Sequence, residues 1–491
     1  MLKKLASETA IYGTSSILSR LLNYVILTPY LTTVFLKGQY GVVSEMYVYA
    51  GLLMVLFTYR METTFFRFGN LAENRERVFS TAMWSLIVST FSLVVILLLF
   101  SQNLANLLEY PDNRDYVIWF IFIIAFDALA AILFARLRLE NRPIRFAILK
   151  TLGIIVNIFF IFFFLEICPW LIEQGFSSIK DFFHEENRIT YIFVANLIGS
   201  ASVLLLMLPE FRHLRFTFDN DLWKKMMWYA APLVIVGLAS VINQLISLPL
   251  IKFLLPYSDK VNMEQVGIYG ACYKIAILMS LFTQAFNYAA EPFFFRNADR
   301  SDAKETYAQV AQAFTLVGCF AFLGIMSYID IVRYFINDKF WEGLSIVPIL
   351  LIAFLMLGIY YNFSIWYKLT DRTKFGAYIS LTGVAITLVL NFLLIPRIGY
   401  IGGAWGALAC YSSMVVLSYV LGQKYFPVDY PIGKMILYIG SSVLVYFISN
   451  TLATAMEWTL VIKLIVNTLL LLSWAGGIYL LDIKNLKAML K

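Results

Sequence analysis

Three basic residues, Arg20, Arg60 and Lys274, lie within long apolar stretches of the sequence. A lone cation at the centre of a membrane helix costs roughly 2.5–3.5 kcal/mol on insertion scales, so it usually faces a cavity or a partner. The planar guanidinium group of arginine suits phosphate and pyrophosphate groups, because it donates to them bidentately. If the three side chains meet, we expect a central cationic cavity that binds an anionic substrate.

Other polar residues accompany these cations. Asn23 follows Arg20 at helical spacing, so the two share one helix face, and Asn23 joins the predicted substrate-binding residues. Asp127 lies in the middle of another apolar stretch and either lines the cavity or forms an ion pair with Arg20. Further candidates for cavity lining or for coupling to an ion are Asn243, Gln244, Glu291 and Asn391.

Several of these candidates also have a purely structural interpretation. Arg60 can extend to the membrane surface or pair with Glu62, because long cationic side chains reach the interface. Glu291 precedes Pro292 and is typical of a helix end. Asn391 is typical of a hydrogen bond between membrane helices. The sequence leaves these alternatives open.

Motifs of familiar enzyme chemistry are missing from the sequence. The two histidines, His184 and His213, lie in polar segments, and no zinc-protease, phosphate-binding-loop or serine-hydrolase motif occurs. The four cysteines are scattered, without the paired spacing of a metal site. We therefore expect no enzymatic activity, no cofactor, no metal site and no nucleic-acid partner.

Composition identifies the environment in which these residues lie. Of the 491 residues, 60% are hydrophobic and only 14% are charged, whereas soluble proteins carry about 25% charged residues. An apolar helix of about 20 residues crosses the hydrocarbon core of a membrane. The sequence predicts an all-α integral membrane protein with about fourteen transmembrane helices, at 8–36, 40–66, 78–101, 115–137, 146–170, 188–209, 226–255, 265–292, 305–328, 344–368, 375–395, 402–422, 433–453 and 458–481.

The basic residues between these spans predict the orientation. Most loop lysines and arginines lie on the side of the membrane that holds the N terminus. By the positive-inside rule this side is the cytoplasm, and an even number of spans places the C terminus there as well. The first residues lead directly into a long span, so we expect no cleavable signal peptide.

A predicted helical hairpin at 8–67 recurs later in the chain. Asn23 and Pro29 have the same six-residue spacing as Asn243 and Pro249. The hairpin ends with Leu-Phe-Thr and then Phe-Phe-Arg, and the same two tripeptides recur within 281–296. Repeated bundles around a central site are typical of alternating-access transporters. We expect an N-terminal lobe at 1–209, a cytoplasmic interfacial linker helix at 210–225, a C-terminal lobe at 226–424, and an extra helix pair with a cytoplasmic tail at 425–491.

Two segments carry a resemblance to a known family. The first is Val266–Ala276, read VGIYGACYKIA, and the second is Ile395–Ala407, read IPRIGYIGGAWGA. Both resemble the polysaccharide flippase branch of the multidrug/oligosaccharidyl-lipid/polysaccharide exporter superfamily, which includes the O-antigen flippases and the lipid II flippase. The predicted spans and the duplication extend this resemblance over the whole chain.

The resemblance implies two pseudo-symmetric six-helix lobes in a V shape, with two additional C-terminal helices. It implies a transporter that flips an undecaprenyl-pyrophosphate-linked oligosaccharide, either lipid II or a polysaccharide repeat unit, across the bacterial cytoplasmic (inner) membrane. Basic residues on spans one, two and eight line the cavity of such a flippase, and Arg20, Arg60 and Lys274 occupy those spans here. Expected partners are the polyprenyl-pyrophosphate-linked glycan, membrane lipid, a coupling ion (proton or sodium), and other polysaccharide-assembly membrane proteins.

Two alternatives and one departure from the family pattern stay open. Span eleven lacks the carboxylate that coordinates sodium in the lipid II flippase, which argues against sodium coupling. Transport would then be driven by protons or by the membrane potential. A cation-coupled multidrug antiporter of the same superfamily would normally have twelve spans and an acidic cavity. A membrane glycan polymerase would need a catalytic loop, for which the only candidate carboxylates are Glu173, Asp181, Glu185 and Glu186.

Overall fold

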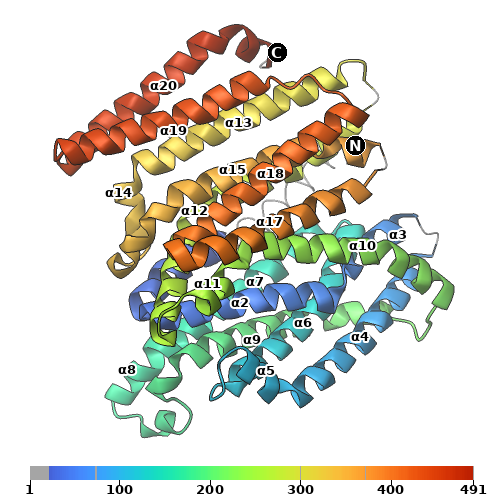
Figure 1. Ribbon diagram of the computed structural model, residues 1–491. Helices are drawn as coiled ribbons and strands as arrows, with labels where there is room; N and C mark the ends of the chain where they lie inside the picture. The colour runs from blue at the N-terminus through green and yellow to red at the C-terminus, as the bar shows by residue number, and fades with distance from the viewer. Residues whose placement is uncertain (1–20, 72–73, 299, 371, 490–491) are drawn as a thin grey trace. The chain divides into compact units, whose positions relative to one another are not determined.

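The computed structural model describes residues 21–489, apart from 72–73, 299 and 371. These residues form helices joined by short turns, and no strand occurs among them (Figure 1). Thirteen helices of the described chain are long and apolar enough to cross a membrane, and each corresponds to a predicted span. Of the first predicted span, the described part is an apolar helix at Leu21–Val34. The protein is thus an all-helical, multi-pass membrane protein, which confirms the prediction from composition.

The chain forms two compact units. The first unit holds the described residues up to Leu27 together with Met46–Val241, and the second holds Thr28–Glu45 together with Ile242–Lys491. Two helices contribute to both units: α2 (Lys37–Thr58) begins in the second unit, and α10 (Asn220–Leu245) begins in the first. The tip of the first hairpin therefore belongs to the second unit, a division that the repeat in the sequence does not indicate.

The first unit is built around one central helix, α6, which packs against α3, α4, α5, α7 and α9. Its buried core joins side chains of α3, α4, α6, α7 and α10. Besides the shared helices, its elements are α3 (Met61–Leu71), α4 (Arg75–Leu99), α5 (Ser101–Leu107), α6 (Arg114–Leu139), α7 (Pro143–Phe162), a π-helical turn (Phe163–Ile167), α8 (Cys168–Glu173), 3₁₀ turns (Ser177–Asp181, Glu185–Asn187 and Leu208–His213) and α9 (Arg188–Leu206).

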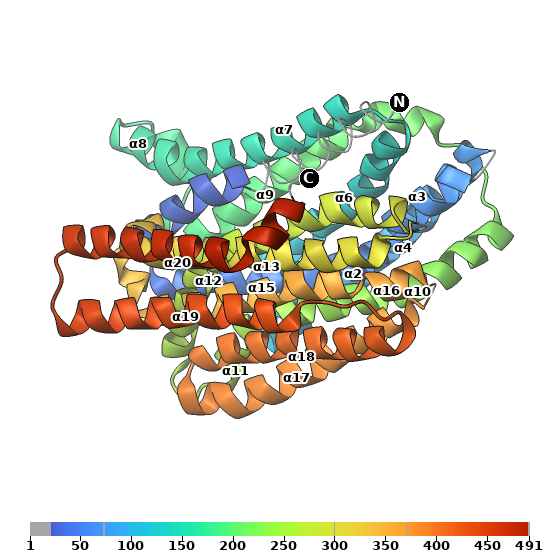
Figure 2. The same cartoon turned by 90° about the horizontal axis from the view of Figure 1, so that it is seen from above.

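The second unit is built around α12, which packs against α11, α13, α15 and α16. The helix pair α19 and α20 joins this unit along α13 (Figures 1 and 2). The elements are α11 (Ser247–Leu254), α12 (Asp259–Arg296), α13 (Ala303–Ser327), α14 (Ile329–Val332), 3₁₀ helices (Arg333–Phe335 and Asp338–Ile346), α15 (Val347–Phe363), α16 (Ile365–Leu369), α17 (Lys374–Ile398), α18 (Ile401–Tyr425), α19 (Ile432–Ala455) and α20 (Leu460–Met489).

Polar contacts fasten the pair α19 and α20 to its neighbours. The Asn467 side chain donates to the backbone carbonyl of Ser327 at 2.8 Å, and the Lys463 ammonium lies 2.6 Å from the Asp330 carboxylate. The Gln312 amide of α13 donates to the Tyr438 hydroxyl at 2.8 Å. Buried hydrogen bonds of this kind hold membrane helices together, because the surrounding lipid offers the polar groups no partner.

The prediction of one linker helix at 210–225 is wrong as to its shape. A 3₁₀ turn ends at His213, an irregular segment follows, and α10 begins at Asn220. The irregular segment is held by side chains of α4, because the Ser80 hydroxyl accepts from the Arg215 amide at 3.0 Å and Thr81 accepts from the Asp219 amide at 3.3 Å. The Arg77 guanidinium also lies 2.7 Å from the Asp219 carboxylate. These tertiary contacts outweigh the amphipathic pattern, which on its own predicts a continuous helix.

Two predicted spans are interrupted helices. The span predicted at 226–255 breaks at Ile246, between α10 and α11. The span predicted at 40–66 breaks at Tyr59 and Arg60, which both have positive φ, 33° and 56°. Non-glycine residues rarely adopt this left-handed conformation, which often marks a functional position.

Candidate functional site

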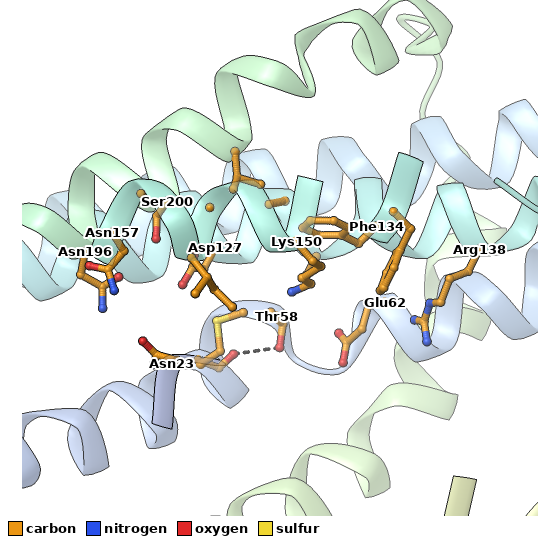
Figure 3. Close-up of a pocket in the computed structure, with 18 of the residues that line it drawn as sticks. Asn23, Thr58, Glu62, Asp127, Phe134, Arg138, Lys150, Asn157, Asn196 and Ser200 are labelled. Atoms are coloured by element: carbon orange, nitrogen blue, oxygen red, sulfur yellow. Dashed lines mark hydrogen bonds between the residues drawn. The ribbon is translucent and has the colours of Figure 1, made fainter. Parts of the chain in front are cut away.

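The first unit contains a cavity of about 600 Å³ (Figure 3). This volume lies within the usual range of small-molecule sites, roughly 300–1,000 Å³. The cavity is lined by Asn23, Met54, Val55, Thr58, Arg60, Glu62, Asp127, Ala130, Ala131, Phe134, Arg138, Phe146, Lys150, Gly153, Ile154, Asn157, Asn196, Gly199, Ser200 and Val203. Charged and amide side chains are prominent among these, which is unusual inside a membrane bundle and indicates a site for a polar ligand.

Three helices present one face each to this cavity. The lining residues recur every three or four positions, at 127, 130, 131, 134 and 138 on α6, at 146, 150, 153, 154 and 157 on α7, and at 196, 199, 200 and 203 on α9. This is the spacing of a single helix face. The orientation of each helix about its own axis therefore decides which polar residues reach the cavity.

Two glycines bring α7 and α9 close together at the cavity wall. A Cβ atom added to Gly199 would lie 3.0 Å from the backbone oxygen of Gly153 and 3.2 Å from Cβ of Asn157. A Cβ atom added to Gly153 would lie 2.5 Å from a methyl group of Val203. Small residues allow such close approach of membrane helices. The contact brings Asn157 of α7 beside the cavity face of α9.

One end of the cavity, which we call the cationic end, contains Arg60, Arg138 and Lys150. Two of these cations lie over aromatic rings: the Lys150 ammonium is 4.3 Å from the Phe134 ring centre, and the Arg138 guanidinium carbon is 5.6 Å from that of Phe66. The Glu62 carboxylate lies 3.8 Å from the Arg60 guanidinium. Because three cations face one carboxylate here, the cationic end favours an anionic ligand.

Arg60 reaches the cationic end because of the break between α2 and α3. Its left-handed backbone turns the chain, and the Tyr59 hydroxyl hydrogen-bonds Ser85 of α4 at 2.7 Å, which holds the turn. Gly237 of α10 leaves the space that the guanidinium occupies, since a Cβ atom there would lie 2.6 Å from Nε of Arg60. Backbone strain of this kind costs on the order of 1–3 kcal/mol and persists only where the surroundings impose it.

The other end of the cavity, which we call the amide end, contains Asn23, Asp127, Asn157, Asn196 and Ser200 (Figure 3). The Asp127 carboxylate interacts with the Ser200 hydroxyl and lies within electrostatic reach of Lys150. The Asn196 amide donates to the Tyr47 hydroxyl at 2.6 Å. The side-chain oxygens of Asn23 and Asn157 are buried and accept no hydrogen bond from the described residues. This end is therefore rich in hydrogen-bond acceptors.

The structure brings together three of the residues singled out in the sequence. Asn23, Arg60 and Asp127 line the same cavity. Arg20 lies outside the described residues. Lys274 lies on α12 of the second unit, where its side chain is half-buried, so the cavity of the first unit does not include it.

The remaining candidates belong to the second unit or to its boundary. Asn243 is buried, donates to the Ser380 carbonyl at 3.2 Å and accepts from the Thr387 hydroxyl at 3.3 Å. Asn391 is buried and donates to the Thr387 carbonyl at 2.6 Å. Both asparagine side chains therefore form hydrogen bonds within the second unit. Gln244 is half-buried near the end of α10, and the side chain of Glu291 lies outside the described structure.

Among the charged and amide side chains that line the cavity, four are not indicated by the sequence analysis: Arg138, Lys150, Asn157 and Asn196. Arg138 and Lys150 lie near the ends of their predicted spans, so the sequence does not distinguish them from loop charges that set the orientation. The start of α7 is the feature that could have identified Lys150 as a residue of the helix. Pro143 occupies the first turn of α7, where proline is favoured, so Lys150 lies two turns inside the helix. Asn157 and Asn196 lie near the middle of their spans, and their polarity alone could have drawn attention to them.

Comparison with solved structures finds the same fold in transport proteins. A structure titled "Lipid II flippase MurJ, inward closed conformation" matches with a TM-score of 0.72 and 14% identity over 96% of this chain and all of that one. An inward-facing multidrug resistance MATE family transporter of the MOP superfamily matches with a TM-score of 0.64 and 11% identity over 84% of this chain and 94% of that one. A mutant of the Vibrio cholerae MATE transporter VcmN matches with a TM-score of 0.59 and 14% identity over 86% and 96%.

Comparison of sequences identifies the family. Curated protein sequences give no match. The family model described as "Polysaccharide biosynthesis protein" matches residues 5–298, which is more than half of the chain. This match agrees with the resemblance of Val266–Ala276, and the fold agrees with that of the superfamily of exporters. The chain therefore belongs to the polysaccharide biosynthesis protein family.

Proposed function

We propose that this protein is a flippase, which moves an undecaprenyl-pyrophosphate-linked oligosaccharide from the inner to the outer leaflet of the cytoplasmic membrane. The glycan would be a polysaccharide repeat unit or lipid II, and the pathway would be cell-envelope polysaccharide biosynthesis. Membership of the polysaccharide biosynthesis family supports this choice, as does the fold shared with a lipid II flippase. The observation that carries the proposal is the cationic end of the cavity, with Arg60, Arg138 and Lys150.

The chemistry of this end fits a pyrophosphate group. Two arginines and a lysine offer charge-assisted hydrogen bonds, each worth roughly 1.5–3 kcal/mol. A pyrophosphate that leaves water for a low-dielectric bundle needs such partners, because an unpaired buried charge is very costly. The proposed orientation, with both termini in the cytoplasm, places the cationic end on the cytoplasmic side. There it meets the leaflet from which the lipid-linked glycan is collected.

The competing function is a cation-coupled multidrug antiporter. Glu62 and Asp127 are the observation in its favour, because a carboxylate in a membrane cavity can attract a cationic drug. Against it, the same cavity holds three cations, which would repel such a drug. The two functions therefore differ in the sign of the ligand charge that the cavity accepts.

Native mass spectrometry of the gently purified protein separates these functions. The variant Arg138→Ala with Lys150→Ala removes two positive charges from the cavity, and Arg75→Ala with Lys180→Ala removes the same charge from exposed surface positions. We expect a polyprenyl-pyrophosphate glycan to co-purify with the wild type and with the surface variant, and to be lost from the cavity variant. Its mass would identify the sugar. Binding of cationic drugs by all three proteins, with no lipid-linked glycan, would instead support the antiporter.

Separate variants test the two cations on spans one and eight, Arg20 and Lys274. Arg20→Ala and Lys274→Ala test whether the substrate also contacts residues beyond the described cavity of the first unit. Under the proposed function each is expected to weaken retention of the glycan lipid in the same experiment, because the resemblance places basic residues of these spans in the cavity.

A further inference from the structure

The two ends of the cavity differ in the kind of hydrogen-bonding group that lines them. The cationic end offers donors, in the guanidinium and ammonium groups of Arg60, Arg138 and Lys150. The amide end offers acceptors, because the side-chain oxygens of Asn23 and Asn157 are buried and accept nothing from the described residues. Asp127 adds a carboxylate, an acceptor-only group when ionised, at the side of the amide end that faces Lys150 (Figure 3).

Buried acceptors without a donor are unfavourable. Among the asparagine oxygens of this kind in the described chain, those of Asn23 and Asn157 belong to residues that line the cavity, where a ligand can reach them. A ligand that brings O–H or N–H groups would supply the missing donors. A phosphate group brings none and would be repelled by Asp127. The amide end is therefore unsuited to the pyrophosphate and suited to a neutral group rich in hydroxyls.

We propose that the amide end is a subsite for the sugar ring next to the pyrophosphate, and that Asn157, Asp127 and Asn23 accept hydrogen bonds from its hydroxyl or acylamino groups. This inference rests on the proposed function, since it requires the pyrophosphate to occupy the cationic end. Asn157 then helps the protein to bind a glycosylated carrier lipid more tightly than a bare one.

The distance between Lys150 and Asn157 along α7 agrees with a ligand whose pyrophosphate occupies the cationic end and whose first sugar occupies the amide end. Lys150 and Asn157 lie on one face of α7, seven residues apart, which corresponds to about 10 Å along the helix axis. The first sugar of a pyrophosphate-linked glycan is bonded directly to the second phosphate. A pyrophosphate at Lys150 thus directs the sugar along the cavity wall, toward Asn157.

A metal cation at the amide end is the less favourable occupant. The described residues hold no cluster of three or more His, Cys, Asp or Glu side chains. Asp127 also lies within electrostatic reach of Lys150, which already offers it a positive charge. A second cation at Asp127 would be repelled by Lys150, whereas a neutral sugar would not.

The test compares carrier lipids with and without a sugar. The probes are undecaprenyl pyrophosphate and the same lipid carrying one glucosyl, galactosyl or N-acetylglucosaminyl residue, titrated against purified protein in nanodiscs. Asn157→Leu removes an acceptor at similar size, and Asn23→Leu is a second variant, in case the first lowers the melting temperature. Asn70→Leu is the matched control, because Asn70 is exposed and its amide donates to the backbone carbonyl of Phe66, away from the residues that line the cavity.

We expect the wild type to bind its best sugar-bearing probe about 10-fold more tightly than the bare lipid. Asn157→Leu and Asn23→Leu should each remove most of this preference and leave binding of the bare lipid within about 2-fold. The control should behave as the wild type. Arg138→Ala with Lys150→Ala should weaken binding of both lipids to a similar extent.

Three results would overturn the inference, and they are distinguishable from failure of the proposed function. The first is a wild type that binds the bare lipid as tightly as every sugar-bearing probe. The second is an Asn157→Leu variant that loses affinity for both lipids equally. The third is a sodium requirement for binding that Asp127→Asn or Asn157→Leu abolishes, because the amide end would then be a cation site. If the wild type binds no carrier lipid at all, the proposed function itself fails.

Discussion

Arg60 illustrates how a single residue combines an unfavourable backbone with a useful side chain. Its φ of 56° is left-handed, and its guanidinium lies against Gly237 at the edge of the cavity. A left-handed backbone costs an L-residue roughly 1–2 kcal/mol, whereas glycine adopts it readily. The chain nevertheless keeps arginine there, which fits a role for the charge.

Replacement of Arg60 by glycine or alanine separates the backbone from the charge. Both variants remove the guanidinium, so both should lose glycan-lipid binding to the same extent. Arg60→Gly should be more stable than Arg60→Ala by about 1 kcal/mol, because only glycine relieves the left-handed strain. Thermal unfolding in detergent measures the difference. Equal stability of the two variants would mean that this residue is not left-handed in solution.

A buried ion pair is the second feature at the residue scale. Lys252 of α11 lies 3.6 Å from Glu45 of α2, within the second unit, and their side chains are only 3% and 0% exposed. Loss of one partner leaves a buried charge without its counter-ion, which typically costs 3–5 kcal/mol. Replacement of both by apolar residues of similar size is often neutral or stabilising.

The ion pair therefore predicts a pattern of stability in three variants. Lys252→Met should lower the free energy of unfolding by about 3 kcal/mol or more, and Glu45→Met should have a similar effect. The double variant should recover most of the loss. Asp302→Asn, which breaks the exposed ion pair with Arg300, is the control and should leave stability unchanged. Additive losses in the double variant would contradict the assigned pairing, and thermal unfolding gives all four values.

At the scale of the elements, close contact between α2 and α12 organises the second unit. A Cβ atom on Gly267 would clash with the backbone oxygen of Lys37, and one on Gly41 would clash with that of Met263. A backbone atom cannot move aside as a flexible side chain can. The two helices can therefore cross at this distance only if glycine occupies both positions.

Gly267→Ala is expected to destabilise the protein by roughly 1–3 kcal/mol, because the added methyl group forces the two helices apart. Gly440 of α19 is the matched control: it also lies inside a membrane helix, but a Cβ atom there would meet nothing within 4 Å. Gly440→Ala should therefore be neutral, or stabilising by at most about 1 kcal/mol. Melting temperatures of the two variants test this contrast, and similar effects of both would refute the close crossing.

At the scale of the whole molecule, the chain passes between its two units several times. The passages lie after Leu27, after Glu45 and after Val241, and the last two fall inside the continuous helices α2 and α10. If transport proceeds by alternating access, as proposed, these helices must bend or shift their packing as the units rearrange. The break between α10 and α11 at Ile246 lies close to one passage and is suited to such a change.

The orientation of the whole molecule predicts which loops reagents can reach. Cysteine placed at Arg75 should lie in the cytoplasm and cysteine placed at Lys180 outside, by the positive-inside rule. The four native cysteines are buried, so we expect the reagent not to reach them. A membrane-impermeant maleimide should label Lys180→Cys on intact cells, and should label Arg75→Cys only after the cells are permeabilised. The opposite pattern would reverse the orientation and with it the proposed direction of transport.

Most helices and their approximate limits could be predicted from the sequence, because a membrane helix satisfies its own backbone hydrogen bonds and needs only an apolar run of sufficient length. It also indicated Asn23, Arg60 and Asp127, since polar residues in the middle of apolar runs stand out. It did not indicate the break at Tyr59 and Arg60 or the irregular segment before α10, which depend on contacts with α4 and α10.

Which charges share a cavity depends on how the helices pack against one another. Arg138 and Lys150 lie near span ends, where the sequence cannot distinguish a loop charge from a lining residue. Their place in the cavity follows from the rotation of α6 and α7 about their axes, and that rotation is fixed by packing such as the contact of Gly153 with Gly199. Lys274 lies on α12, which belongs to the other unit. Hydrophobicity places a residue in the membrane, but side-chain packing between helices decides which way it faces.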